Sequence, residues 1–574
     1  MNALTLSAAV TSGRVQLVNV RQHSLLQAKV RVMWILAVFA MIAAIALSRI
    51  GFLGLIEQVP RALTMAEALL PPRGEIVDRN NAPLARAFPA YALWFNPAAL
   101  GDGPPLIKTP AEVAAALVRI FPDEDLALLT ARLAAGKPGY LRRRILPEDA
   151  NKIHMLGEPA LEFPRENERY YPQGSMAAHI LGYVGADGHG RVGMEQVFDQ
   201  RLNDPASRGA PSVLSIDTRV QGALEDELGR GMLESNAKGA AGIILDVDTG
   251  EVLALASLPS FNPNRIDQAG AANIFNRVTN QVYELGSTFK PLTVAAAIDA
   301  GVVTDMAKRY PAGHPLQIDN FQIHDHENYG SSLNVPEALI HSSNVVTAQI
   351  GDQLGGVRLN AVMRSLGMNQ RPYIELPAKG FPLWPRGNWA RITTMTVSFG
   401  HGIAVTPLHL ASAYAALVNG GIWRPSTLEK LAPGQAPAGR RVFKASTSAR
   451  MRQLLRMIVV DGTGRKANAP GFRVGGKTGS AEKPGVGGYR KNSLVATFAA
   501  AFPMDRPRYV IVAMLDEPQG TVATSFQRTA AWNAAPIVGR VVPRIGPLLG
   551  IMPDDSRDID ISDLSPLVGN GNGE

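Results

Sequence analysis

Three short patterns in the chain carry the side chains that a serine acyl transfer requires. In order they are S-x-x-K at 287–290, S-x-N at 342–344 and K-T-G at 477–479, the last followed by Ser480. A serine hydroxyl is a weak nucleophile until a neighbouring base takes its proton, and a lysine amine of lowered pKa can be that base. The patterns therefore predict a nucleophilic serine surrounded by amine, hydroxyl and amide groups.

The first pattern lies where a helix is expected to begin. The segment 288–300 carries Pro291 in its first turn and is followed by Gly301, as helices commonly are. Residues three apart share one helix face, so we expect the Lys290 amine to reach the Ser287 hydroxyl. Apolar neighbours would lower the pKa of that amine. A simple N-cap serine is the structural alternative here.

The other two patterns offer groups that could hold a substrate. Ser342 and Asn344 follow a short helical segment, and a hydroxyl and an amide there could relay a proton and hold a peptide amide. The run 477–480 is expected to be an edge strand, where positive charge and hydroxyls bind a carboxylate. The alternative for the S-x-N pattern is a polar turn, and the alternative for 477–480 is a glycine loop. The GxxxxGK spacing of a phosphate-binding loop is absent before Lys477.

Pattern matching alone does not select these positions. S-x-x-K also occurs at 235–238 and 480–483, and S-x-N also occurs at 332–334, whereas K-T-G occurs once. Position at a helix start and order along the chain favour 287–290 and 342–344.

The N-terminal region is typical of a single membrane anchor. Several basic residues lie within 1–31, no acidic residue precedes Glu57, and 32–48 is uncharged and strongly apolar. The positive-inside rule places the N-terminus in the cytoplasm. We predict a cytoplasmic tail at 1–31 and a transmembrane anchor at 32–52. A cleaved signal peptide is the alternative, because 44–46 reads Ala-Ile-Ala.

Beyond the anchor the chain is expected to be a multidomain α+β protein. Residues 53–212 are rich in turn signals and predict an extended, non-catalytic pedestal domain. Residues 213–553 have strand-like segments at both ends and helical ones between, which predicts an antiparallel sheet covered by helices. Within this part, 241–256 reads as a hairpin around an Asp-Thr-Gly turn. The Asp-rich, then Gly/Asn-rich segment 554–574 predicts a disordered tail.

Composition narrows the possible chemistry further. The 574 residues include no cysteine, which excludes thiol catalysis, disulfides and cysteine-ligated metals. The net charge of +8 comes without a dense Lys/Arg block, so a solvated basic surface is favoured over a nucleic-acid partner. His324 and His326 alternate, as two metal ligands on one strand face do, but no third ligand stands out. We therefore predict no metal and no cofactor.

At this point the sequence resembles the class B penicillin-binding proteins over nearly everything after the anchor. Within that class it looks most like the division-specific (septal) peptidoglycan D,D-transpeptidases, the FtsI type. Segments typical of the family stand on both sides of residue 212, at 73–80 (RGEIVDRN), 171–174 (YPQG), 193–195 (GME), 283–291 (YELGSTFKP), 398–402 (SFGHG) and 406–407 (TP). One departure is Ser480, where threonine is commoner; a hydroxyl is retained.

The resemblance implies a role for each catalytic residue. Ser287 attacks the carbonyl of the penultimate D-alanine of a stem peptide and releases the last D-alanine, with Lys290 as base. Ser342 passes the proton to the leaving amine, Lys477 supports it electrostatically, and Asn344 holds the substrate amide.

The substrate-binding strand has implied roles as well. Thr478 and Ser480 hold the terminal carboxylate beside Gly479, and the backbone N–H groups of Ser287 and Ser480 form an oxyanion hole. An amine on a neighbouring stem peptide then completes the cross-link, and β-lactams acylate the same serine.

The resemblance also implies a location and partners. The protein is expected in the inner membrane as a single-pass protein with its catalytic domain in the periplasm. The expected partners are a polytopic glycan-polymerising glycosyltransferase and small bitopic division proteins.

The sequence leaves other functions open. The elongation-specific class B transpeptidase is the near alternative. A carboxypeptidase or β-lactamase would use the same acylation groups, but requires an activated water, and no deacylating glutamate is identifiable. A non-catalytic penicillin-binding scaffold is disfavoured because all three motifs are intact.

Overall fold

The computed structural model describes residues 8–11, 14–17, 20–56, 71–101, 103–185, 187–485 and 488–568. The chain forms two compact units, Met1–Leu70 and Pro71–Glu574, each of which is described by itself.

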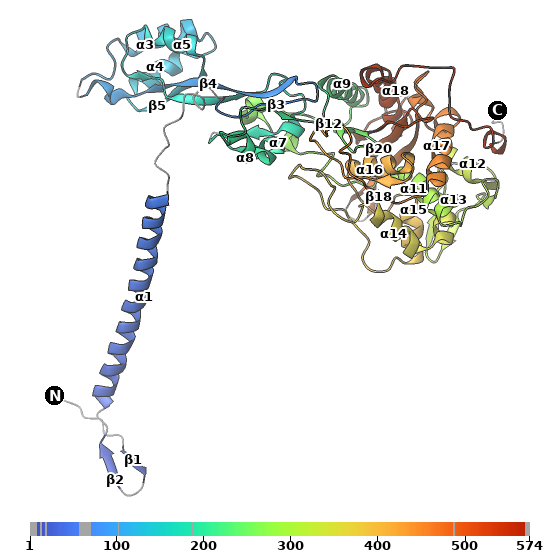
Figure 1. Ribbon diagram of the computed structural model, residues 1–574, viewed down its shortest axis with the longest axis horizontal. Helices are drawn as coiled ribbons and strands as arrows, with labels where there is room; N and C mark the ends of the chain where they lie inside the picture. The colour runs from blue at the N-terminus through green and yellow to red at the C-terminus, as the bar shows by residue number, and fades with distance from the viewer. Residues whose placement is uncertain are drawn as a thin grey trace. The chain divides into compact units, whose positions relative to one another are not determined.

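The first unit is dominated by one long helix. Helix α1 spans Val20–Ile56 and follows a short antiparallel pair of strands, β1 (Ala8–Thr11) and β2 (Arg14–Leu17) (Figure 1). Its segment Gln27–Arg49 is long and apolar enough to cross a membrane, with 23 residues. The apolar helix expected at 32–52 is therefore present, although it begins earlier than the sequence predicted.

The N-terminal part of the second unit is built on a six-stranded sheet. Its central strand is β4 (Pro83–Phe95), and the main path runs β10-β3-β4-β5, with β6 and β7 also paired to β4. The other strands are β3 (Ile76–Val77), β5 (Gly139–Ile145), β6 (Leu161–Glu162), β7 (Arg165–Tyr170) and β10 (Ser212–Val213). Helices α3 (Pro110–Ile120), α4 (Leu126–Ala134) and α5 (Pro147–His154) belong to this part.

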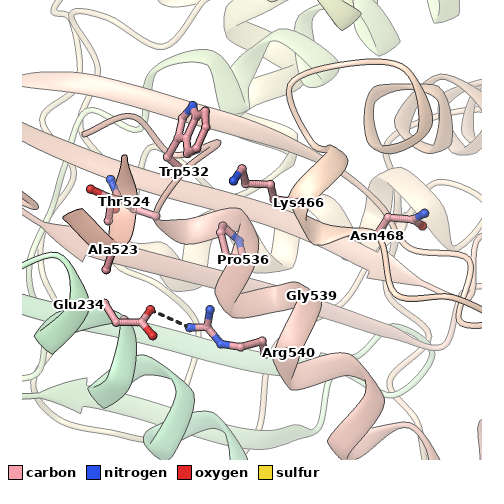
Figure 2. Close-up of a pocket in the computed structure, with 11 residues that line it drawn as sticks. Glu234, Lys466, Asn468, Ala523, Thr524, Trp532, Pro536, Gly539 and Arg540 are labelled. Atoms are coloured by element: carbon pink, nitrogen blue, oxygen red, sulfur yellow. Dashed lines mark ion pairs between the residues drawn. The ribbon is translucent and has the colours of Figure 1, made fainter. Parts of the chain in front are cut away.

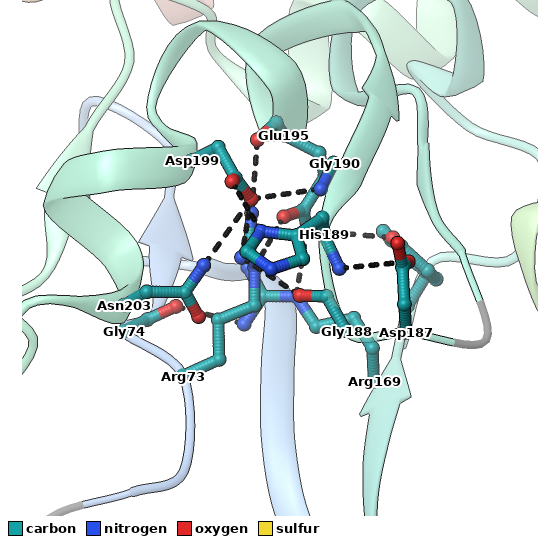
Figure 3. A network of polar contacts seen from close by, with 11 residues as sticks. Arg73, Gly74, Arg169, Asp187, Gly188, His189, Gly190, Glu195, Asp199 and Asn203 are labelled. Carbon is teal, nitrogen blue, oxygen red and sulfur yellow. Dashed lines mark hydrogen bonds and ion pairs between the residues drawn. The ribbon is translucent and has the colours of Figure 1, made fainter. Parts of the chain in front are cut away.

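A buried ion network joins distant segments of this part (Figure 3). The carboxylate of Glu195, which is fully buried, accepts from Arg73 Nε at 2.8 Å and from Arg169 Nε at 2.6 Å. Arg73 also reaches Asp199 Oδ1 at 2.8 Å, so each guanidinium has an acidic partner. Buried charges are tolerated only when paired in this way. The motif residues at 73 and 195 therefore hold the start of the pedestal to its helical end, which comprises α7 (Gly193–Val197) and α8 (Asp199–Asn203).

The C-terminal part contains a five-stranded antiparallel sheet of order β12-β11-β21-β20-β19. The strands are β11 (Gly239–Asp246), β12 (Val252–Leu258), β19 (Gly475–Gly485), β20 (Gly488–Phe502) and β21 (Tyr509–Asp516). The predicted hairpin is β11–β12, and the predicted meeting of the domain's two ends is the β11–β21 pair. Both expectations are confirmed.

Helices cover both faces of this sheet. Along β21, Val510, Val512 and Met514 face one core, whereas Ile511 and Ala513 face the other, because side chains alternate along a strand. Helices α9 (Thr218–Glu234) and α18 (Ala534–Ile545) supply the second core. The first core contains residues of α11 (Lys290–Asp299), α16 (Pro407–Val418) and α17 (Ala445–Val460).

The second unit contains further helices and strands, most of them short. The helices are α6 (Ala178–Leu181), α10 (Ala271–Ile274), α12 (Val335–Ile340), α13 (Asn344–Leu354), α14 (Gly356–Ser365) and α15 (Arg391–Ser398). The strands are β8 (Tyr183–Val184), β9 (Gly190–Val192), β13 (Tyr310–Pro311), β14 (Leu316–Ile318), β15 (Phe321–Ile323), β16 (Ser332–Leu333), β17 (Ile422–Trp423) and β18 (Arg440–Arg441).

The C-terminal segment differs from the disordered tail predicted at 554–574. Residues up to 568 run along the domain, where Leu564 is buried and Asp558 pairs with Arg456 at 2.6 Å. The main-chain oxygen of Leu567 accepts from Asn334 Nδ2 at 2.7 Å. Polar composition was a poor guide because a few spaced apolar side chains are enough to attach such a segment. The last six positions lie outside the described residues.

Candidate active site

The first motif occupies a tight turn that leads into a buried helix. A 3₁₀ turn, η3, covers Gly286–Phe289, and α11 continues from Lys290. Ser287 is half-buried in that turn, whereas Lys290 is fully buried. Gly286 has φ +53 and lies against the neighbouring loop: a Cβ on Gly400 would fall 2.1 Å from the Gly286 oxygen. The close approach of these two glycines lets the loop pack directly beside the predicted nucleophile.

The buried amine of Lys290 is directed at the second motif. It donates to Ser342 Oγ at 3.1 Å and also to the Ser342 main-chain oxygen. We expected this amine to reach the Ser287 hydroxyl, since the two residues are three apart. Both hydrogen bonds of the Lys290 amine in the described part of the chain instead go to Ser342, so the link between the first two motifs comes from packing and not from helix spacing.

Ser342 has a left-handed backbone between two helices. Its φ of +63 lies in the region that favours glycine, and it sits between α12 and α13. Backbone strain of this kind persists only where the surroundings enforce it, and it clusters at functional sites. The next residue helps to enforce it, because the Ser343 N–H donates to the Ala338 oxygen at 2.8 Å and its hydroxyl caps the N–H of Val346.

Asp325 is a site residue that sequence reasoning missed. Its carboxylate accepts from Ser343 Oγ at 2.6 Å, from the Val345 N–H at 3.0 Å and from the N–H of Asn344. A carboxylate at a helix N-terminus satisfies orphan N–H groups and complements the helix dipole. The Asn344 amide donates to the adjacent His324 oxygen at 3.1 Å. The segment around Asp325 therefore fixes the S-x-N motif, and no periodic signal in the sequence pointed to it.

The third motif brings a second lysine to the same serine. Lys477 lies on β19, at the edge of the sheet, and its amine donates to Ser342 Oγ at 2.9 Å and to Thr478 Oγ1 at 3.2 Å. Burial lowers the pKa of Lys477 to about 7. Burial first, and then the charge of Lys477, holds the pKa of Lys290 well below the usual lysine range. The amines of two lysines thus donate to one hydroxyl, and the pKa of each lysine is lowered.

Gly479 of the third motif lies against the turn that carries Ser287, whereas Thr478 and Ser480 contact other segments. A Cβ on Gly479 would lie 2.4 Å from the Leu285 oxygen, so only glycine allows β19 to approach η3 this closely. The Thr478 hydroxyl lies 2.8 Å from Thr463 Oγ1. Ser480 Oγ accepts from the Ala530 N–H at 3.0 Å, which leaves its own proton free to donate. The edge strand predicted at 477–480 is confirmed.

A separate cavity lies away from these residues (Figure 2). It has a volume of about 380 Å³ and contains an ion pair between Arg540 and Glu234 at 3.6 Å, with the Lys466 amine 3.7 Å from the Trp532 ring centre. None of the predicted site residues lines it.

Two buried lysines on one serine hydroxyl, a serine-bearing turn and a glycine-containing edge strand define an active-site serine protein of the penicillin-binding class. Residues 240–541 match the penicillin binding protein transpeptidase domain. Residues 68–208 match the penicillin-binding protein dimerisation domain. The chain belongs to the class B penicillin-binding proteins, and the resemblance drawn from its motifs is confirmed.

Named relatives agree with this assignment. The chain is 40% identical over 489 residues to the probable peptidoglycan D,D-transpeptidase FtsI of Caulobacter vibrioides, which covers 83% of this chain and 82% of that protein. It is 31% identical to the peptidoglycan D,D-transpeptidase FtsI of Escherichia coli K12, over 87% of this chain and 88% of that protein. Its structure resembles penicillin binding protein 3 of Mycobacterium tuberculosis complexed with ampicillin, with a TM-score of 0.67 and 25% identity over 86% of this chain and 99% of that one.

Proposed function

We propose that the protein is a peptidoglycan D,D-transpeptidase that works through an acyl-enzyme on Ser287. The observation that carries the proposal is the meeting of the Lys290 and Lys477 amines at Ser342 Oγ, next to the turn that bears Ser287. The names of the FtsI relatives support the same reaction class.

Acylation begins when Ser287 attacks the carbonyl carbon of the penultimate D-alanine. The Ser287 proton passes to the neutral Lys290 amine, and the carbonyl becomes a tetrahedral oxyanion held by the backbone N–H groups of Ser287 and Ser480. Losing one such donor typically costs about 2.7–4 kcal/mol of barrier. The C–N bond then breaks, and the last D-alanine leaves with a proton supplied through Ser342.

Deacylation reverses the same sequence with a new amine. The amine of a second stem peptide attacks the acyl carbon, gives up a proton through Ser342 and Lys290, and releases Ser287 as a free hydroxyl. During acylation, Thr478, Ser480 and the charge of Lys477 would hold the donor's terminal carboxylate, which leaves with the last D-alanine. Asn344 would hold the donor's amide.

A division role is favoured over an elongation role by the names of the FtsI relatives. The elongation-specific reading stays the second candidate, since motifs and geometry are common to both. A midcell band of a fluorescent fusion in growing cells supports the septal role, and a dispersed side-wall pattern supports elongation.

The proposed reaction also bears on where each segment of the chain lies relative to the membrane. The helix Gln27–Arg49 and the FtsI relatives support a single-pass membrane protein. We assign a cytoplasmic tail to 1–31, so that the pedestal (53–212) and the transpeptidase domain (213–553) lie in the periplasm. A polytopic glycan polymerase and small bitopic division proteins are its proposed partners.

A labelled penicillin tests the enzyme assignment. We expect stable, stoichiometric labelling of the full chain that disappears in Ser287→Ala and persists in Ser365→Ala, which changes a half-buried serine at the end of α14 and serves as a control. Rapid loss of label with release of a hydrolysed product would instead identify a hydrolase. Absence of labelling in the unmodified protein would overturn both readings.

A further inference from the structure

A carboxylate lies three residues before the nucleophile and has no role in the acylation chemistry above. The Glu284 side chain is 11% exposed and accepts from the Tyr489 hydroxyl at 3.1 and 2.9 Å. It also accepts from the Gly402 N–H at 3.2 Å. Neutral donors alone hold this carboxylate beside the active-site turn.

Glu284 has no cationic partner in the described part of the chain. No lysine or arginine described there forms an ion pair with it, and its nearest basic group is His401 Nδ1 at 3.9 Å. Burial, and then the charge of Lys290, lowers the pKa of His401, so the imidazole is neutral near pH 7. Burial also raises the pKa of Glu284. A buried carboxylate of this kind is stabilised when a cation binds to it.

The position of Glu284 places it beside the path of a peptide along β19. Tyr489, on β20, pairs with Pro484 of the edge strand β19 near the end of the β19–β20 hairpin. Pro484 lies beyond Ser480 along β19. The ring of the loop residue His401 lies 5.6 Å from the Tyr489 ring at an interplanar angle of 49°. The neighbouring Gly400 packs on the turn of the nucleophile. A substrate that pairs with the edge strand therefore passes this carboxylate.

A cavity lies next to the loop that contains His401 and Gly402. Gly402, which donates to Glu284, also lines a cavity of about 670 Å³. Its other walls include the exposed ring of Phe381 together with Trp384 and Arg386. A side chain or chain segment that binds at Glu284 has room beyond it.

A carboxylate with an aromatic ring beside it is a site for an alkylammonium group. We propose that Glu284 and Tyr489 bind the side-chain ammonium of a diamino acid in a stem peptide, an assignment that rests on the proposed transpeptidase function. That function requires an amine-bearing peptide as acceptor. The same ammonium chemistry could also come from the donor peptide.

Two arms separate these sources. In the first, the full-length protein is given donor pentapeptides whose third residue carries either a free or an N-acetylated side-chain amine, and D-alanine release is measured. In the second, one acetylated donor is used, and transfer to a free-amine tripeptide is measured against hydrolysis. We expect a preference of about 10-fold or more in at least one arm, as for a charge-assisted hydrogen bond. The preference is the ratio of free-amine to acetylated donor in the first arm, and the ratio of transfer to hydrolysis in the second.

Glu284→Gln should reduce that preference to about 2-fold or less, because the amide keeps the shape and removes the charge. Tyr489→Ala, at a ring that is 45% exposed and tolerant of change, should reduce it several-fold. Glu234→Gln, in the separate cavity of Figure 2, should leave it intact.

Loss of preference in the first arm places the ammonium on the donor, and loss in the second places it on the acceptor. The proposal is overturned if the unmodified protein shows no preference in either arm, or if Glu284→Gln retains it. Failure of the transpeptidase assignment looks different: the unmodified protein would then neither take up penicillin nor release D-alanine from any donor.

Discussion

The amine of Lys290 donates to both the main-chain oxygen and the hydroxyl of Ser342, 52 residues further along the chain, and the second bond measures 3.1 Å. Ser342 is thereby placed to exchange protons with the proposed base, and Lys477 donates to the same hydroxyl at 2.9 Å. This arrangement makes Ser342 the connection between the two lysines.

Removal of that connection should slow acylation without unfolding the protein. Ser342→Ala keeps a Cβ at a residue whose φ is +63, so backbone strain is unchanged. We expect the second-order rate of penicillin acylation to fall about 10²–10⁴-fold, the usual contribution of a proton-transfer group. A loss of less than about 3-fold, with Ser365→Ala as the control, would contradict the proton-relay role.

The pH dependence of acylation should reflect the two buried lysines. Burial holds the pKa of Lys290 well below the usual range, and in the proposed mechanism this lysine acts as a base when neutral. Lys477 is protonated below its pKa of about 7 and neutral above it, so its electrostatic support is lost as pH rises through that value. The acylation rate should therefore decline above about pH 7.

Lys477→Ala should remove that decline at a lower overall rate. Lys466→Ala, which changes an exposed lysine, should preserve it. A rate in the unmodified protein that keeps rising from about pH 6 to about pH 9 would show that Lys477 acts without its charge.

Asp325 should act as a positioning residue for the S-x-N motif. In Asp325→Asn one side-chain oxygen becomes an N–H donor that faces other donors, so Ser343 and α13 lose part of their anchor. We expect penicillin acylation to fall about 10–100-fold, as a small displacement of a catalytic group can do. The free energy of unfolding should drop by only about 1–2 kcal/mol.

The nearby exposed Glu327→Gln is the matched control and should change neither quantity. An effect of Asp325→Asn on thermal unfolding alone, with acylation unchanged, would indicate a purely structural cap.

The buried network around Glu195 should contribute to the free energy of unfolding and not to the rate of penicillin acylation. Glu195→Gln leaves the guanidiniums of Arg73 and Arg169 buried without their shared carboxylate. Breaking a buried pair from one side destabilises by about 3–5 kcal/mol. Thermal unfolding should show this loss, while the folded fraction still takes up labelled penicillin at its normal rate.

Asp187→Asn provides the comparison on the surface. Its pair with Arg191 is about half exposed on both sides and should contribute less than about 1 kcal/mol. Equal effects of the two variants would contradict the importance of burial in the network.

Local sequence signals were sufficient for most of the secondary structure and for the identity of the motifs. The hairpin β11–β12, helix α16 and edge strand β19 follow from alternation, helix periodicity and glycine placement, all of which act over a few residues. The same signals failed at the C-terminal tail, where attachment depends on a distant partner such as Arg456.

The geometry of the site was decided by contacts between distant segments. Neither the Lys290–Ser342 bonds, nor the anchoring of Ser343 by Asp325, nor the placement of Glu284 next to Tyr489 has a local signature. Each depends on the packing of helices and loops against the five-stranded sheet. Residue type and order could therefore identify the reaction class, whereas the partner of each amine and carboxylate was determined only when the folded chain brought remote residues within hydrogen-bonding distance.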